Sequence, residues 1–226
     1  MREVIEFLEA LRLHNDKEWF DANKDRYMAA KERFDAFVGE LIGRIASFDQ
    51  SVADLTPRDC TYRIYRDLRF TSDKTPYKTH MSAFIAPHGK NGGYGGYYLH
   101  VEPEGSGMLG GCLLCTGIYM PQATVLKSLR EEVMDNGAAM RAAIEKACGF
   151  QLDHGRAISR NPLGFPSDTD YDDLLRLKDY LLDRPIDRNY LTAPDAIDRV
   201  AGDFAGTTDF LTIVNRAVKY AYDEMM

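Results

Sequence analysis

Five cationic side chains occur within sixteen residues, in the stretch "RIYRDLRFTSDKTPYK" at 63–78. They are Arg63, Arg66, Arg69, Lys74 and Lys78. A guanidinium group pairs at two points with carboxylate or phosphate oxygens, and an ammonium group adds a mobile point charge. Because the whole chain has a net charge of −7, this local positive charge stands against an acidic background. The stretch therefore predicts a binding site for a small anion.

Two further residues are candidates for proton transfer at such a site. In "YYLHVEP" at 97–103, the alternation of a β-strand places Tyr98, His100 and Glu102 on one face. The imidazole of a histidine titrates near neutral pH, and Asp67 lies among the arginines. We therefore take His100 and Asp67 as candidate catalytic residues for acid or base chemistry on a bound anion.

The same residues also fit a purely structural role. Residues 58–78 contain six cations and three acids, a balance of only +3. Arg63 opposite Glu102 would be an ordinary cross-strand ion pair. For His100 alone a structural role is favoured, because no nucleophile with the context of a catalytic triad accompanies it. For the five cations as a group the anion site is favoured, because acids elsewhere in the chain would repel an anion.

The elements that must position these residues begin with a strand predicted at "TYRIYR", residues 61–66. Its alternation would separate a polar set from an apolar set: Arg63, Tyr65, Asp67 and Arg69 on one face, and Tyr62, Ile64, Leu68 and Phe70 on the other. Arg66 falls on the apolar side, so we expect either a β-bulge or a buried guanidinium paired with a carboxylate. The following "TSDKTPYK" favours a turn that brings Lys74 and Lys78 back beside the strand.

The surrounding pattern predicts an α+β fold in a single domain spanning 1–226. Strands are predicted at "TYRIYR", "HMSAFIAP", "GYYLHVEP" and "MLGGCLLCTGIY". Their short connections favour a four-stranded antiparallel meander, enclosed by N- and C-terminal helices. Helical spacing of apolar residues predicts helices at 4–11, from 16 to about 47, at 123–148, at 170–182 and at 206–226, with a long loop at 153–170.

Composition limits the partners that the protein can have. An acidic chain lacks the cationic surface that nucleic acid or anionic lipid requires, so nucleic acid is disfavoured as a partner. No apolar segment has the length needed to cross a membrane, and we expect a cytoplasmic protein with reduced thiols. Cys112 and Cys115 lie three apart in a predicted strand, where they would point to opposite faces, so no metal site is predicted there. The residues specify no cofactor.

Two quoted stretches also carry a family resemblance. "NDKEWFDANKDRY" at 15–27 and "RIYRDLRFTSDKTPYKTH" at 63–80 resemble an uncharacterised bacterial and fungal family of unknown function. The resemblance runs nearly end to end, through "GYYLHVEP", "GIYMP", "NPLGF" and "LLRLKDY" in the order typical of that family. Leu163 stands where that family usually has a basic residue. The resemblance implies the domain boundaries, and it implies no activity, cofactor or substrate.

Two functions from different classes remain open. The first is a protein or enzyme that binds a small phosphorylated or carboxylated metabolite with the Arg and Lys cluster over the sheet. The alternative is a non-catalytic interaction domain that docks an acidic peptide or a nucleic-acid phosphate, with exposed aromatic rings adding contact area. A concave site with converging cations favours the first, and an exposed flat patch favours the second.

Overall fold

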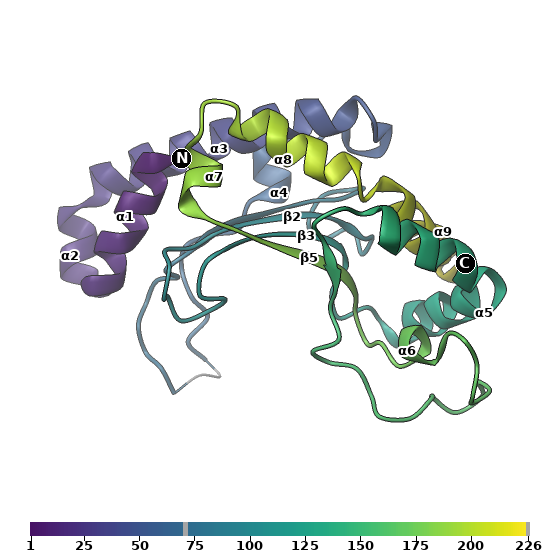
Figure 1. Cartoon of the computed structure of the whole chain (residues 1–226). Coiled ribbons are helices and arrows are strands. Elements are labelled where there is room, and N and C mark those ends of the chain that lie inside the picture. Colours follow the sequence, from purple (N-terminus) through teal and green to yellow (C-terminus); the bar gives the residue numbers. More distant parts are fainter. Residues whose placement is uncertain (70–71, 225–226) are drawn as a thin grey trace.

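The computed structural model describes residues 1–69 and 72–224, which fold as an α+β structure around one open antiparallel sheet (Figure 1). Over these residues the sheet has five strands, in the order β1-β2-β3-β5-β4, and every neighbouring pair is antiparallel. The strands are β1 (Met81–Ile85), β2 (Gly96–Val101), β3 (Cys112–Ile118), β4 (Gln151–Leu152) and β5 (Tyr180–Ile186). The predicted α+β class is confirmed, whereas the predicted number of four strands is wrong.

The strand predicted at "TYRIYR" does not form. In the described part of 61–80 the backbone makes two isolated bridges, Thr61 to Ala83 and Tyr65 to Tyr77. The segment doubles back on itself, and the backbone N–H of Lys78 donates to the carbonyl of Ile64 at 2.8 Å. The predicted alternation of faces is therefore wrong for this segment, and Phe70 of that prediction lies outside the described residues. We call residues 62–80 the arginine loop.

The fifth strand replaces most of a helix that the sequence predicted at 170–182. Only α6 (Asp172–Leu175) is helical there, and β5 follows it. β5 pairs with β3 over seven residues, from Cys112 opposite Ile186 to Ile118 opposite Tyr180. Such long-range pairing overrides local helix propensity, because the strand gains a ladder and buries one face against the core.

The N-terminal part contains α1 (Arg2–Leu13), α2 (Lys17–Ala22) and α3 (Lys24–Ala46). Asp16 caps α2, since its carboxylate accepts from the backbone N–H of Trp19 at 2.8 Å. The predicted single helix from 16 to about 47 is interrupted at Asn23, whose φ of −112° and ψ of 21° are not helical. The apolar stripe of α3 is buried, as its spacing predicted.

The remaining helices complete the shell around the sheet. They are η1 (Gln50–Val52), α4 (Pro57–Cys60), α5 (Ala123–Lys146), α7 (Arg188–Thr192), α8 (Ala196–Ala205) and α9 (Thr208–Asp223). α5 covers most of the helix predicted at 123–148 and is kinked at Asn136. α8 was not predicted. Among the described residues, no helix combines the length and apolar character that a membrane span requires.

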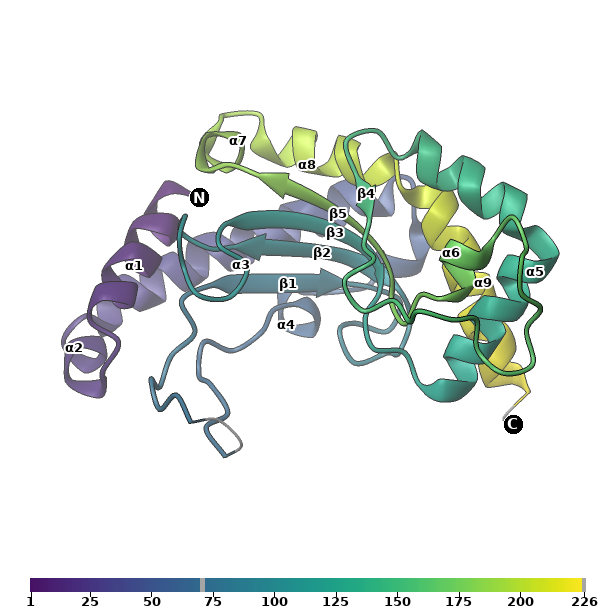
Figure 2. The ribbon, with the colours of Figure 1, turned by 60° about the horizontal axis from the view of Figure 1, so that its bottom comes forward.

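The two faces of the sheet have different surroundings. Helices α3 and α8 lie over one face, and the arginine loop and the loop at 153–171 extend from the other side (Figures 1 and 2). On the helical side the ring of Tyr97 lies 5.2 Å from that of Phe204 in α8. By strand register, the opposite face carries a different set of residues. We call it the open face and define it by Ser82, Phe84, Tyr98, His100, Leu113, Cys115 and Asp183.

Candidate functional site

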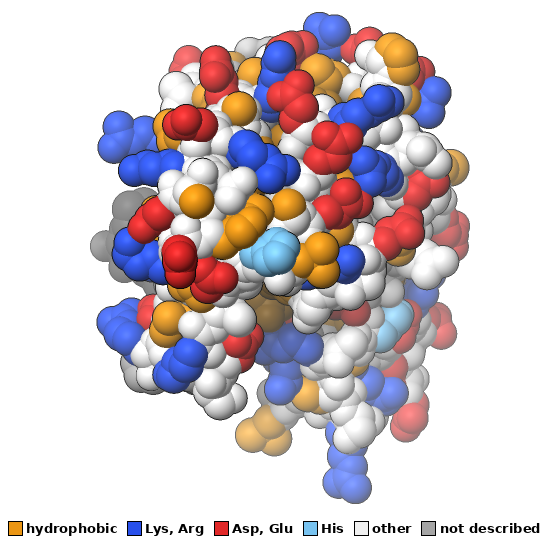
Figure 3. Space-filling model, turned by 90° about the vertical axis from the view of Figure 1, so that its left-hand side faces the viewer, with side chains coloured by type: hydrophobic (Ala, Val, Ile, Leu, Met, Phe, Trp, Pro, Cys, Tyr) orange, Lys and Arg blue, Asp and Glu red, His pale blue; other side chains and the backbone are white. Residues whose placement is uncertain are grey.

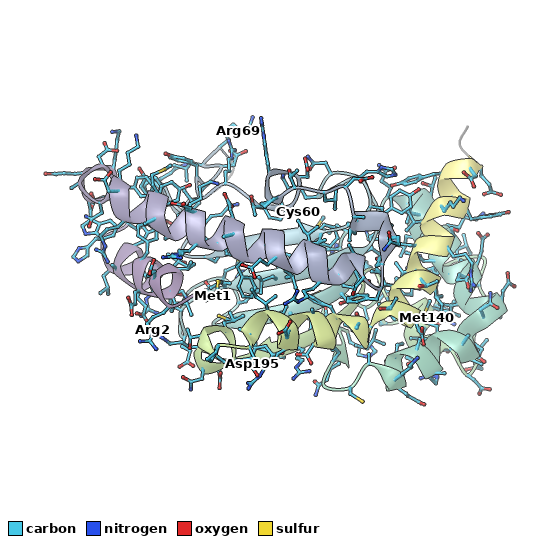
Figure 4. The ribbon with its side chains drawn as sticks, turned by 90° about the horizontal axis from the view of Figure 1, so that it is seen from above. Met1, Arg2, Cys60, Arg69, Met140 and Asp195 are labelled. Atoms are coloured by element: carbon cyan, nitrogen blue, oxygen red, sulfur yellow. The ribbon has the colours of Figure 1, made fainter. Side chains whose placement is uncertain are left out.

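Three of the five cations predicted to bind an anion are instead bound to other groups of the arginine loop. The Arg69 guanidinium donates to the Asp67 carboxylate, with Nη2 2.6 Å from Oδ2 and Nε 2.9 Å from Oδ1 and 3.2 Å from Oδ2. Arg66 is half-buried, and its Nη1 lies 2.5 Å from Oδ2 of Asp73, which confirms its predicted carboxylate partner. Lys74 donates to a backbone carbonyl of the loop at 3.1 Å. Figure 4 places Arg69 at the periphery of the molecule, beyond α3.

The other two cations, Arg63 and Lys78, lie near each other. Lys78 is half-buried, with its Nζ 5.7 Å from the ring centre of Tyr62. Burial and the positive charge of Arg63 lower the pKa of Lys78. Among the described residues, neither cation forms an ion pair with a carboxylate. The loop therefore neutralises part of its positive charge and leaves Lys78 and Arg63 outside its ion pairs, although the charge of Arg63, after the hydrogen bonds from Arg69, helps to lower the pKa of Asp67.

A polar chain runs along the open face of β2. The hydroxyl of Tyr98 lies 3.0 Å from Nδ1 of His100, and Nε2 of His100 lies 3.1 Å from Oε2 of Glu102. His100 and Glu102 have no exposed side-chain surface. Because an ionised carboxylate can only accept, Nε2 carries the hydrogen and Tyr98 donates to Nδ1. The predicted face of Tyr98, His100 and Glu102 is confirmed.

The Glu102 carboxylate is also held by the turn that follows β2. Its oxygens accept from the backbone N–H groups of Met108 at 3.1 Å, Leu109 at 2.8 Å and Gly110 at 3.2 Å. Burial opposes ionisation of this carboxyl group, but the N–H of Leu109 and the His100 ring outweigh it, and the pKa of Glu102 is lowered. A fixed carboxylate is thus set beside a histidine in the interior.

A second histidine joins this chain from the end of the arginine loop. The ring of His80 stacks on that of His100, with 4.6 Å between centroids and 29° between planes. One nitrogen of each ring and one oxygen of Glu102 all lie within 4.8 Å of one another. Two imidazoles and one carboxylate are a donor set that transition metal ions accept.

The arginine loop is fastened to the N-terminal helices at Tyr77. The side-chain amide of Asn15 makes two hydrogen bonds to the backbone of Tyr77: it donates to the carbonyl at 2.9 Å and accepts from the N–H at 3.1 Å. The ring of Phe20 stacks on that of Tyr77 at 3.9 Å. The two stretches at 15–27 and 63–80 are thus in direct contact and form one unit.

The family model described as "Conserved hypothetical protein (DUF2461)" matches residues 3–212. The chain belongs to the DUF2461 family. Searches of curated proteins and of solved structures found no match to the chain. The description of the family names no reaction.

The titration of the two histidines in this DUF2461 chain follows from their burial. Burial, with contributions from His100 and Lys78, lowers the pKa of His80 to about 4. Burial also lowers the pKa of His100, although Glu102 opposes it. Both rings are therefore neutral at pH 7. Each keeps one nitrogen that can accept a proton or a metal ion.

A second polar pair lies on the same face, on β3 and β5. Burial, followed by the charge of Asp183, raises the pKa of Cys115, and burial raises the pKa of Asp183. Cys112 points to the other side of β3, and its thiol donates to the carbonyl of Glu102 at 3.3 Å. The prediction that these two cysteines face opposite ways is confirmed.

The structure separates the two candidate catalytic residues. Asp67 is exposed and paired with Arg69, whereas His100 is buried in the sheet. The sequence reasoning missed His80 and Ser82. The alternation of polar and apolar residues in "HMS" at 80–82 could have placed both residues on the polar face of a strand. In the sheet, Ser82 of β1 lies directly opposite His100 of β2.

Proposed function

We propose that the protein binds a small phosphorylated or carboxylated molecule at the edge of the open face, between Arg63 and Lys78. The supporting observation is the environment of Lys78. Its half-buried ammonium group has another cation, Arg63, as an electrostatic neighbour, and no carboxylate of the described residues pairs with it. Partial burial of an unpaired charge is costly, and an anionic ligand would offset that cost.

The position of Lys78 also directs the ligand toward the histidines. Lys78 lies close enough to His80 to lower the pKa of that ring, and His80 stacks on His100. An anion held by Lys78 and Arg63 would therefore place the rest of the molecule beside the His80 ring. In this proposal the other three cations of the arginine loop, Arg66, Arg69 and Lys74, stabilise the fold of the loop and do not bind the ligand.

The proposal is tested by calorimetric titration of inorganic phosphate, pyrophosphate and citrate into the full chain, at low salt and with a chelator present. We expect Lys78→Met and Arg63→Gln each to weaken binding about tenfold or more, the effect of losing one charge-assisted contact. Arg69→Gln is the matched control, because Arg69 is already paired with Asp67. The proposal fails if Lys78→Met binds as tightly as the parent, or if Arg69→Gln loses as much as Arg63→Gln.

A second candidate function, docking of an acidic peptide, is favoured by one observation. Tyr62 and Tyr65 of the arginine loop are 41% and 49% exposed, and exposed aromatic rings supply contact area at protein interfaces. On the face with the N-terminal helices, acidic and basic side chains are intermixed (Figure 3), so this face offers no broad cationic surface for nucleic acid. Tyr65→Ala separates the candidates, because it would abolish peptide binding and leave phosphate binding unchanged.

A further inference from the structure

We infer that His80, His100 and Glu102 form a binding site for one divalent transition metal ion of the Zn²⁺, Fe²⁺ or Mn²⁺ type. Each residue contributes one ligand atom, and these atoms lie within 4.8 Å of one another. Two neutral imidazoles and one carboxylate are the donors that such ions take in sites with open coordination positions. All three residues are buried, with His80 the most exposed at 8%.

The unpartnered ring of His80 is the second observation that points to a ligand. Among the residues that the structure describes, no hydrogen bond engages the His80 side chain. The described side-chain atoms that are fully enclosed without a partner belong to Asp35 and Asp183, so the His80 nitrogens keep access to solvent, from which an ion can reach them. Its neighbours are the His100 ring on one side and Lys78 on the other. A metal ion shared with His100 and Glu102 would give the His80 ring a partner within the protein.

The surroundings of the other two ligands fit this role. Three backbone N–H groups fix the Glu102 carboxylate, and Tyr98 fixes the far nitrogen of His100. Such outer partners orient metal ligands in known sites. On binding, the single proton of the His100 ring would move by exchange with solvent from Nε2 to Nδ1, which would then donate to Tyr98. The hydroxyl of Tyr98 would turn its own hydrogen toward Ser82, which is within hydrogen-bond reach.

Two features oppose metal binding: the stacking of the two histidine rings and the positive charge of Lys78. The rings of His80 and His100 are stacked, so the His80 ring has to turn before both lone pairs meet at one point. No hydrogen bond from the described residues holds that ring in place. Lys78 adds a nearby positive charge that repels a metal ion. Lys78→Met is therefore expected to tighten metal binding, whereas the proposed anion site requires the same change to weaken phosphate binding.

The test is calorimetry with Zn²⁺ and absorption spectroscopy with Co²⁺, on the chelator-treated and dialysed full chain without phosphate. We expect one ion per chain and the visible Co²⁺ bands of a low-symmetry nitrogen and oxygen site. His80→Gln should weaken binding by more than about 100-fold, and Tyr98→Phe by about tenfold, as for outer-shell partners elsewhere. His154→Gln is the matched control, because His154 is exposed and distant in sequence.

The inference is overturned if the parent binds no ion, if His80→Gln binds as tightly as the parent, or if His154→Gln loses as much. His100 and Glu102 are fully buried, so variants at these positions are compared only if circular dichroism shows that they fold as the parent does. If they do not fold, the Co²⁺ spectrum of the parent protein is the test of these two ligands. Because phosphate binding is measured with chelator present, failure of the metal site leaves the anion proposal standing, and the reverse also holds.

Discussion

Strand β2 has two buried faces that differ in chemistry. Tyr97, Leu99 and Val101 face the helices and have no exposed surface, and this face is mainly apolar. Tyr98, His100 and Glu102 face the other way and form a continuous hydrogen-bonded chain. Burying polar and charged groups is costly compared with burying apolar groups of similar size, even when they are paired. The helical face therefore supplies apolar burial, and the polar open face is the one beside which we propose binding.

The largest effect is expected from a pair of leucines that are neighbours on β3. Leu114 has no exposed surface and faces the helices, whereas Leu113 is partly exposed on the open face. Leu114→Ala should lower the free energy of unfolding by about 2–5 kcal/mol, because it leaves a cavity in the main core. Leu113→Ala, the matched control, should cost less than about 1.5 kcal/mol, since less apolar surface is lost. Equal losses in urea unfolding would remove the distinction between the two faces.

The next effect concerns the carboxylate of the open face. Glu102→Gln replaces one carboxylate oxygen with an NH₂ group, which then faces either the N–H of Met108 or the N–H groups of Leu109 and Gly110. This loss of acceptors should lower the free energy of unfolding by about 1–3 kcal/mol. Glu104→Gln, at an exposed side chain two residues away, should stay within about 0.5 kcal/mol of the parent. A Glu102→Gln variant as stable as the parent would show that the carboxylate is not held as described.

Local pattern explains which parts of this structure were predictable. The alternation in "GYYLHVEP" predicted the two faces of β2, and the helical spacing of apolar residues predicted the buried stripe of α3. Both features depend on local spacing along the chain. The unpaired state of Lys78 and the position of His80 depend on how the arginine loop folds back, which local alternation does not determine.

Long-range contacts explain the parts that were wrong. Residues 61–66 have the composition of a strand, but Asn15 and Phe20 hold Tyr77 so that the loop pairs with itself. Residues 180–182 belonged to the helix predicted at 170–182, but β3 pairs with the chain from residue 180 to residue 186. In both segments a distant part of the chain decides the conformation.

A smaller, local effect is expected where the arginine loop is fastened. Asn15→Ala removes two hydrogen bonds to the backbone of Tyr77 and should cost about 1–2 kcal/mol. Amide exchange at Tyr77 should accelerate, while amides of β2 keep most of their protection, because the loop can open without the sheet. Asn91→Ala, at an exposed position, is the control. Unchanged exchange at Tyr77 would show that Asn15 does not fasten the loop.

The smallest effect is a loss of stability in acid that comes from two loop carboxylates, Asp73 and Asp172, and not from the open face. The N–H of Thr75, and then Arg66, lower the pKa of Asp73 to about 2. In the loop at 153–171, Asn161, and then Thr169, lower the pKa of Asp172 to about 2. In the folded protein both pKa values lie below the ordinary value of 3.8. The two ionised carboxylates therefore stabilise the folded state fully above about pH 4, and this contribution is lost as the pH falls through 2.

Carboxyl NMR titration of both aspartates measures this response directly. Asp73→Asn serves as control for the first loop, because it removes the titrating group and should leave the Asp172 curve unchanged. Midpoints near 4 for both residues would contradict the hydrogen-bonded loops described above.

The central claim, that the open face carries an anion site at Arg63 and Lys78, is tested most directly by crystallography of crystals soaked in tungstate, a heavy analogue of phosphate. We predict an anomalous peak about 3 Å from both the Lys78 ammonium and the Arg63 guanidinium groups, within hydrogen-bond reach. The same peak should be missing in Lys78→Met crystals. Tungstate bound elsewhere with this position empty, or Lys78 paired with a carboxylate of the chain, would contradict the account.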